Sequence, residues 1–172
     1  MLFTDRSIWT MLHGIVLSGA ALMALAAALF SMRTIRPVAT PAQSRALARL
    51  IVFIAATLWL AVLVGTYIIF PLYRVTPPEG AADLREFPRA FLLASPGTAW
   101  LHAFAMEIKE HVPWIASMLA TAVAFAGMRY RSQLLNDASL RTMATTLLAI
   151  CFVLIAIVGV LGTFINKVAP LQ

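Results

Sequence analysis

The sequence is poor in charged residues and contains a single cysteine. Only 12% of its residues are charged and 62% are hydrophobic, whereas about a quarter of the residues in a typical globular domain are charged. This composition excludes an ordinary soluble domain. With Cys151 as the only cysteine, neither an internal disulfide nor a CxxCH motif for covalent haem attachment can form. The chain also lacks a nucleophile motif and a glycine-rich phosphate loop, which argues against a stand-alone enzyme.

Four hydrophobic segments are long enough to cross a bilayer as helices. Each approaches the ~20 apolar residues that a spanning helix needs, and none shows the alternation that is typical of barrel strands. We therefore predict an all-α integral membrane protein, a single domain over residues 1–172 with four transmembrane helices in a bundle. The predicted helices cover about residues 8–32, 50–70, 110–128 and 142–165.

Charged residues are divided unequally between the two sides of this bundle. The turns after the first and third helices carry seven arginines and one acid: Arg33, Arg36, Arg45, Arg49, Arg129, Arg131 and Arg141, with Asp137. The other side carries six basic and six acidic residues. By the positive-inside rule the arginine-rich turns face the cytoplasm, so both termini face outward. The net charge of +6 therefore reflects membrane topology and not nucleic-acid binding, and we expect a bacterial inner membrane.

Residues 71–98 form the long outer connection in this topology. The prolines within it disfavour one continuous helix. Segment 81–94 mixes charged residues with large apolar ones, so it is predicted to be a short interfacial segment, a docking surface for a partner, or a cap over the bundle. Residues 99–109 are predicted to be an outer helical extension of the third helix.

Two histidines on separate helices are predicted to lie at the same membrane depth. His13 precedes Arg33 by 20 residues and His111 precedes Arg129 by 18. These separations correspond to about 30 and 27 Å along a helix, roughly one hydrocarbon core. Ionisable residues inside membrane segments are rare and are functional candidates by default. The pair suggests one shared ligand, and a b-type haem held through its iron by both histidines is the leading candidate.

Two further residues near this level extend the predicted haem site. Glu107 lies one helical turn from His111 and can accept a hydrogen bond from its ring. Arg74 is expected to emerge at the same outer level, where its guanidinium can bind a haem propionate. Arginine and aromatic residues are also ordinary anchors at the membrane interface, and that interpretation of Arg74 stays open.

Other interpretations of the histidines stay open as well. His102 lies nine residues before His111, on the opposite face of a continuous helix. It becomes a rival ligand if Pro113 begins a new helix. Glu107 and His111, with His13, can also be read as ligands of another metal. A proton relay at a quinone site, or hydrogen bonding at the wet interface alone, would use the same cluster.

Four short helices with histidines on two of them resemble small membrane b-type cytochromes and the anchor subunits of respiratory complexes. The resemblance covers the helix count and His13 with His111. It does not extend to a second histidine pair, because the second and fourth helices contain no histidine. It implies one haem b near the outer face and electron transfer between membrane quinone and an extracytoplasmic redox partner.

The alternative function is a haem-free structural subunit that anchors a larger membrane complex. Helix faces rich in small residues, and the outer loop, would then make the contacts. A transporter is disfavoured, because no charge lies deep in a predicted helix and no helix is broken by a central proline.

Overall fold

A computed structural model describes residues 4–34 and 40–170 of the chain. Within these ranges the chain is all-helical, and no strand occurs. Four helical stretches are long and apolar enough to cross a membrane, and we call them the first to fourth spans: Asp5–Thr34, Pro41–Tyr73, Pro96–Arg131 and Ala138–Val168. The prediction of an all-α protein with four helices long and apolar enough to span a membrane is confirmed.

The first three spans are each built from more than one helical segment. The first comprises α1 (Asp5–Met11), the π-helical η1 (Leu12–Ser18) and α2 (Gly19–Thr34); the second comprises α3 (Pro41–Val64), η2 (Gly65–Ile69) and α4 (Phe70–Tyr73). The third comprises α6 (Pro96–Trp100), η3 (Leu101–Met106) and α7 (Glu107–Asn136), and the fourth is α8 (Ala138–Val168). A short separate helix, α5 (Pro88–Leu93), lies between the second and third spans.

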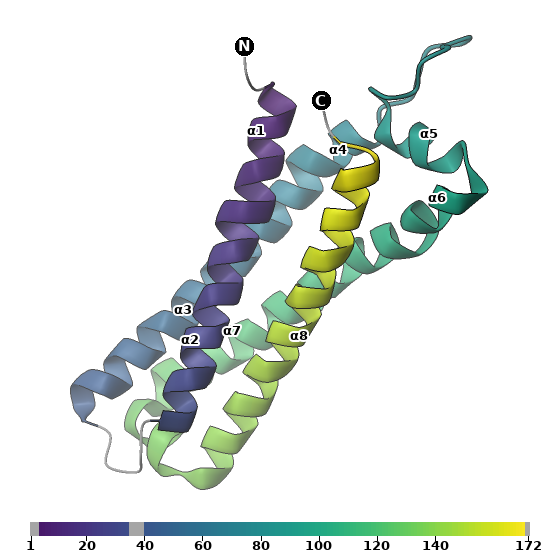
Figure 1. Cartoon of the computed structure of the whole chain (residues 1–172). Helices are drawn as coiled ribbons and strands as arrows, with labels where there is room; N and C mark the ends of the chain where they lie inside the picture. Colours follow the sequence, from purple (N-terminus) through teal and green to yellow (C-terminus); the bar gives the residue numbers. More distant parts are fainter. Residues whose placement is uncertain (1–3, 35–39, 171–172) are drawn as a thin grey trace.

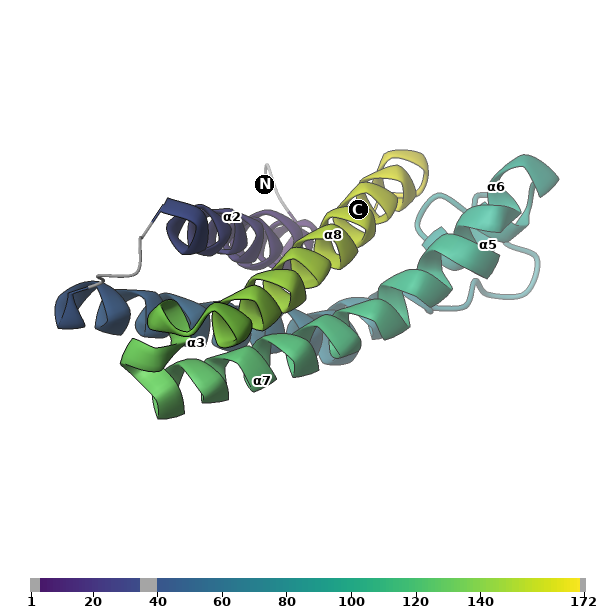
Figure 2. The same ribbon diagram turned by 90° about the horizontal axis from the view of Figure 1, so that it is seen from below.

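The spans form a bundle in which each helix runs antiparallel to the next. The start of α1, the end of α8, α4 and α5 lie at one end, and we call this the outer end (Figure 1). The first span packs against the second and fourth, and the third span also packs against the second and fourth. Seen along another direction, α2 and α8 form one layer and α3 and α7 the other (Figure 2).

Polar side chains define where two of the spans begin. Thr40 caps α3, and its hydroxyl and the Gln43 side chain form a reciprocal capping box, which satisfies two free N–H groups at a helix start. Asp137 caps α8 by accepting a hydrogen bond from the Leu140 N–H at 2.9 Å. These caps lie at the inner end, so the turns between spans follow from local sequence.

Small residues let the helices approach closely in the inner half of the bundle. The first span buries Ala21, Ala24 and Ala28, and alanine faces permit close contact between membrane helices. A continuous apolar core fills this half, with Leu25, Ile51, Ile54, Leu58, Val123 and Leu148 among its larger members. Cys151 belongs to this core as a buried free thiol.

The helices extend further at the outer end than the sequence predicts. The second span continues through Pro71 to Tyr73, and helix resumes at Pro96, so the connection is shorter than residues 71–98. Only Pro88–Leu93 of segment 81–94 is helical. The third span runs unbroken through Pro113. Proline has no N–H, so Pro113 leaves the carbonyl of Lys109, four residues earlier, without its usual helical donor, and helices in membranes tolerate this when neighbouring groups satisfy the freed carbonyl. The Ser117 hydroxyl donates to the carbonyl of Pro113 itself at 2.8 Å.

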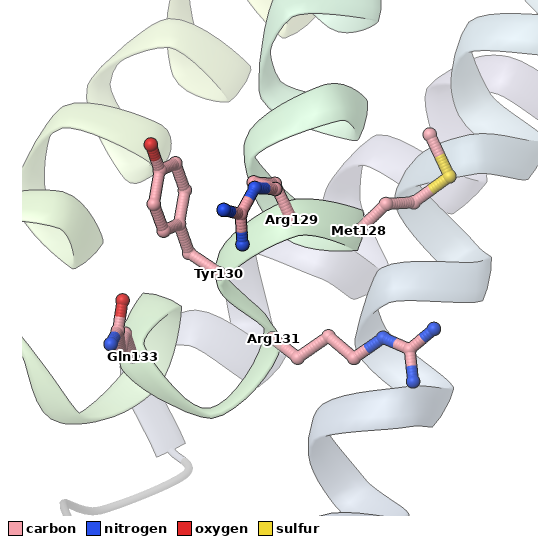
Figure 3. A pocket seen from close by; sticks show the side chains of 5 residues that line it. All are labelled: Met128, Arg129, Tyr130, Arg131 and Gln133. Carbon is pink, nitrogen blue, oxygen red and sulfur yellow. The ribbon is translucent and has the colours of Figure 1, made fainter.

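The inner end carries an open hollow at the end of α7 (Figure 3). It is lined by Met128, Arg129, Tyr130, Arg131 and Gln133, all of them exposed. The Arg129 guanidinium lies 5.6 Å from the centre of the Tyr130 ring, and the backbone departs from helical geometry at Arg131. The hollow is therefore a surface feature of a basic turn, distant from the histidines.

Candidate functional site

Three of the four spans contain a π-helical segment towards the outer end. These are η1 in the first span, η2 in the second and η3 in the third. In η1 the Ser18 hydroxyl donates to the carbonyl of His13, five residues earlier, at 2.8 Å. Single π-helical turns inside α-helices occur frequently at functional sites. The segments carry His13 in η1, Gly65 at the start of η2 and His102 in η3, which directs attention to this part of the bundle.

His13 is half-buried against the second span and is not fully satisfied. A methyl group placed on Gly65 would lie 2.7 Å from Cε1 of the His13 ring, so the ring occupies the space that the missing side chain leaves. The Nδ1 atom is buried and has no hydrogen-bond partner among the described residues. The Ala61 carbonyl lies near the ring without reaching Nδ1. A buried polar atom without a partner is costly and is a reason to suspect a missing ligand.

Lys109, on the third span, lies against the fourth span at the same level of the bundle as His13. Its side chain is half-buried, and a methyl group placed on Gly162 would lie 3.6 Å from its Cε. The ammonium group is within electrostatic reach of the His13 ring. His13, Gly65, Lys109 and Gly162 therefore connect all four spans at one level of the bundle.

The apolar core is interrupted at this level. The inner core ends near Ala21, Leu58, Ala116 and Ile155. A separate outer cluster consists of Tyr73, Leu92, Leu101, Ala105, Met106, Ile165 and Ala169. Neither α1 nor η1 contributes a buried residue to it. Two polar side chains and two glycines thus stand where a continuous bundle would place apolar ones, and this makes the level the candidate site.

His111 faces away from this level. Its side chain is 72% exposed. Its Nδ1 lies 2.8 Å from the Glu107 carbonyl and 3.7 Å from the Glu107 carboxylate. Lys109 and His111 are two positions apart on one helix, about 200° around its axis, so a helix that turns Lys109 inward turns His111 outward. Ile115 and Met118 on the same face are also exposed.

The third helix therefore separates the two histidines that were predicted to share a haem. His13, on the first span, lies near the face that carries Lys109, whereas His111 projects from the other side of the third helix. Glu107 does contact His111, as the spacing suggested. Its role as a hydrogen-bond acceptor for a haem-ligating histidine stays a prediction. Ligation of one iron by His13 and His111 within a single chain requires the third helix to turn about its axis. In the described part of the chain, no three His, Cys, Asp or Glu side chains are grouped to hold a metal ion.

His102 and Arg74 lie further out than Lys109. His102 is half-buried, and its Nδ1 lies 2.8 Å from the Tyr73 hydroxyl. It belongs to the same continuous helix as His111, so the separate outer helix that would make it a rival ligand does not form in the structure. Arg74 is exposed, with its guanidinium 5.2 Å from the Phe70 ring centre. That contact is typical of an interface anchor, and its pairing with a propionate stays a prediction.

Sequence reasoning missed the contributions of Gly65 and Lys109. A signal for Lys109 was present, since Ala116 and Ala120 follow it at helical spacing and both are buried. Lys109 therefore continues the small face by which the third helix packs. No comparable signal marks Gly65, because its role depends on the ring that lies opposite.

Comparison of the chain with protein-family models, with curated proteins and with solved structures finds no match. The assignment of a function therefore rests on the site itself.

Proposed function

We propose that the chain is a multi-pass membrane protein of a bacterial inner membrane, with its outer end on the extracytoplasmic side. Its four long apolar helices support membrane insertion. The arginine-rich turns at the inner end support the orientation, because basic residues accumulate in cytoplasmic loops. Most large exposed side chains along the spans are apolar, including Ile15, Phe30 and Phe125, as a lipid-facing surface requires.

Within that membrane we propose a subunit of a respiratory or other redox complex, which would hold one b-type haem near the outer face. The observation that carries this proposal is His13. Its ring lies among four helices, its buried Nδ1 has no hydrogen-bond partner within the described residues, and it stands between two separate apolar clusters. A neutral imidazole nitrogen is the commonest protein ligand of haem iron.

The residues at this level would supply one histidine ligand to such a group, and a second ligand would have to come from elsewhere. His13 would be the ligand, and the Lys109 ammonium near it would attract a haem carboxylate. His111 would supply the second ligand only after a turn of the third helix, and a partner subunit is the other source. A bound haem would supply one-electron transfer, here between membrane quinone and an extracytoplasmic partner. The protein residues would set its depth and exclude water from its inner side.

A difference spectrum of the purified protein tests the proposal. Protein made with ample haem is solubilised in a neutral detergent, and its dithionite-reduced spectrum is compared with the oxidised one. We expect a b-type α-band with about one haem per chain. His13→Ala should abolish the band, and loss of the band in His111→Ala would identify His111 as the second ligand. Full haem content in His13→Ala would refute the assignment, provided that circular dichroism shows the variant to be folded.

The second candidate function is a haem-free anchor subunit, and the orientation of His111 favours it. A histidine and a glutamate that face outward at the outer end of the third span are placed to meet a neighbouring subunit. A flat spectrum from folded protein that was made with ample haem would support this function. Loss of a defined complex on His111→Ala, with unchanged helicity, would then locate the contact.

A further inference from the structure

A second polar group lies at the outer end, beneath α5, and the haem proposal does not use it. Tyr73 ends the second span and is only 3% exposed. Its hydroxyl lies 2.8 Å from His102 Nδ1 in η3, and the two ring centres are 5.9 Å apart. Arg89 lies on α5 and is within electrostatic reach of both rings. Three separate elements thus bring these side chains together.

The Tyr73–His102 pair retains a free hydrogen-bond donor in either tautomer of the neutral ring. When the tyrosine hydroxyl donates to Nδ1, the Nε2–H of His102 remains free. When Nδ1–H donates to the tyrosine oxygen, the tyrosine O–H remains free. The pair can therefore donate one more bond to an acceptor that approaches from outside it.

The Nε–H of Arg89 is a buried hydrogen-bond donor that is not used within the described residues. Glu110 and Glu107 are the acidic side chains whose charges reach this group. The Glu107 carboxylate lies 3.7 Å from His111, and Arg74 adds a second positive charge near His102. A buried arginine Nε without an acceptor can donate to an oxyanion, and arginine characteristically holds an oxyanion in a bidentate fork.

The surroundings suit a ligand that is polar at one end and apolar at the other. Tyr73 itself belongs to the outer apolar cluster, together with Leu92 and Leu101. Trp100, nearby in the chain, is 48% exposed, and tryptophan is typical of the headgroup level of a membrane. In the proposed topology, phospholipid phosphates lie at this level.

We propose that Arg89, Tyr73 and His102 form a binding site for a phosphate group, held in the membrane as the headgroup of an outer-leaflet phospholipid. Arg89 donates through Nε and an adjacent Nη, and the Tyr73–His102 pair donates a further bond from the second and third spans. A bound phosphate would join α5 to both spans. The site is independent of the haem proposal, because His13 takes no part in it.

Thermal unfolding in a neutral maltoside detergent tests the site, with tryptophan fluorescence as the readout. The protein is titrated with a short-chain phosphatidic acid and, separately, with sodium phosphate against sodium chloride of matched ionic strength. We expect a saturable rise in melting temperature. A rise with the lipid alone assigns the site to a headgroup, whereas a rise with both probes supports the phosphate site and assigns it to free phosphate as well.

Three variants separate a built site from general attraction to positive charge. Arg89→Gln should weaken binding at least about tenfold, as expected for loss of a charge-assisted hydrogen bond. Arg89→Lys keeps the positive charge and should keep the fold, but it loses the bidentate donor pair of the guanidinium. This variant should therefore also bind phosphate more weakly than the wild type. The matched control is Arg85→Gln, because Arg85 is exposed on the same outer segment. Equal losses in the Arg85 and Arg89 variants, unchanged binding in Arg89→Lys, or no response to either probe would overturn the proposal.

Discussion

Replacement of Gly65 by alanine tests directly whether His13 packs against the second span. The new methyl group would lie 2.7 Å from Cε1 of His13, closer than carbon atoms approach without strain. Overpacking of this kind costs about 1–3 kcal/mol. Alanine also favours a helix over glycine by about 1 kcal/mol, so the net expected destabilisation is about 0–2 kcal/mol. The matched control is Gly14→Ala, because no atom lies within 4 Å of a methyl group there.

The decisive comparison is a double-mutant cycle with His13. Unfolding free energies are measured in mixed micelles for Gly65→Ala, His13→Ala and the double variant. In the His13→Ala background the clash is absent, so Gly65→Ala should there be as favourable as Gly14→Ala. We expect a coupling energy of about 1–3 kcal/mol, within the range for residues in contact. Additive effects, or a Gly65→Ala variant as stable as Gly14→Ala, would show that the ring does not occupy this space.

Two further predictions concern the membrane orientation and the packing between the second and third spans. A cysteine at position 85 should react with an impermeant maleimide added outside intact cells, and one at position 131 should react only after lysis; the buried Cys151 should stay unlabelled. The reverse pattern would contradict the orientation. Trp59→Phe removes the 2.9 Å hydrogen bond from Trp59 to Thr121 and should lower stability by about 0.5–1.5 kcal/mol. Thr121→Val should remove the same bond, so the double variant should lose less than the sum in chemical unfolding, whereas simple additivity would contradict the contact.

The two polar levels at the outer end have different characters. The His13–Lys109 level lies between four spans and borders the inner core, and its His13 Nδ1 has no hydrogen-bond partner in the part of the chain that the structure describes. The group of Tyr73, His102 and Arg89 includes residues of α4, η3 and α5, and its Arg89 Nε has no hydrogen-bond partner in the described ranges. Because they use different residues, variants at one level should leave the other intact. The haem and phosphate proposals can therefore be tested independently of each other.

Hydrophobic length was sufficient to predict the four long helices. A segment of about 20 apolar residues in lipid has to be helical, because no water satisfies its backbone. The outer ends of the spans were predicted less well. Prolines at positions 71, 96 and 113 suggested interruptions, yet proline can occupy the first turn of a helix, as Pro71 and Pro96 do, or lie inside a membrane-type helix, as Pro113 does.

The sequence alone determined that His13, Lys109 and His111 lie near the outer ends of their helices, since depth follows from the count of residues to the first charge. Only the tertiary structure decided which of them faces the bundle. The sides of the third helix are apolar towards both lipid and protein, so hydrophobicity does not distinguish them. Close packing does, because it selects the small face of Ala116 and Ala120. That choice turns Lys109 towards His13 and leaves His111 outside.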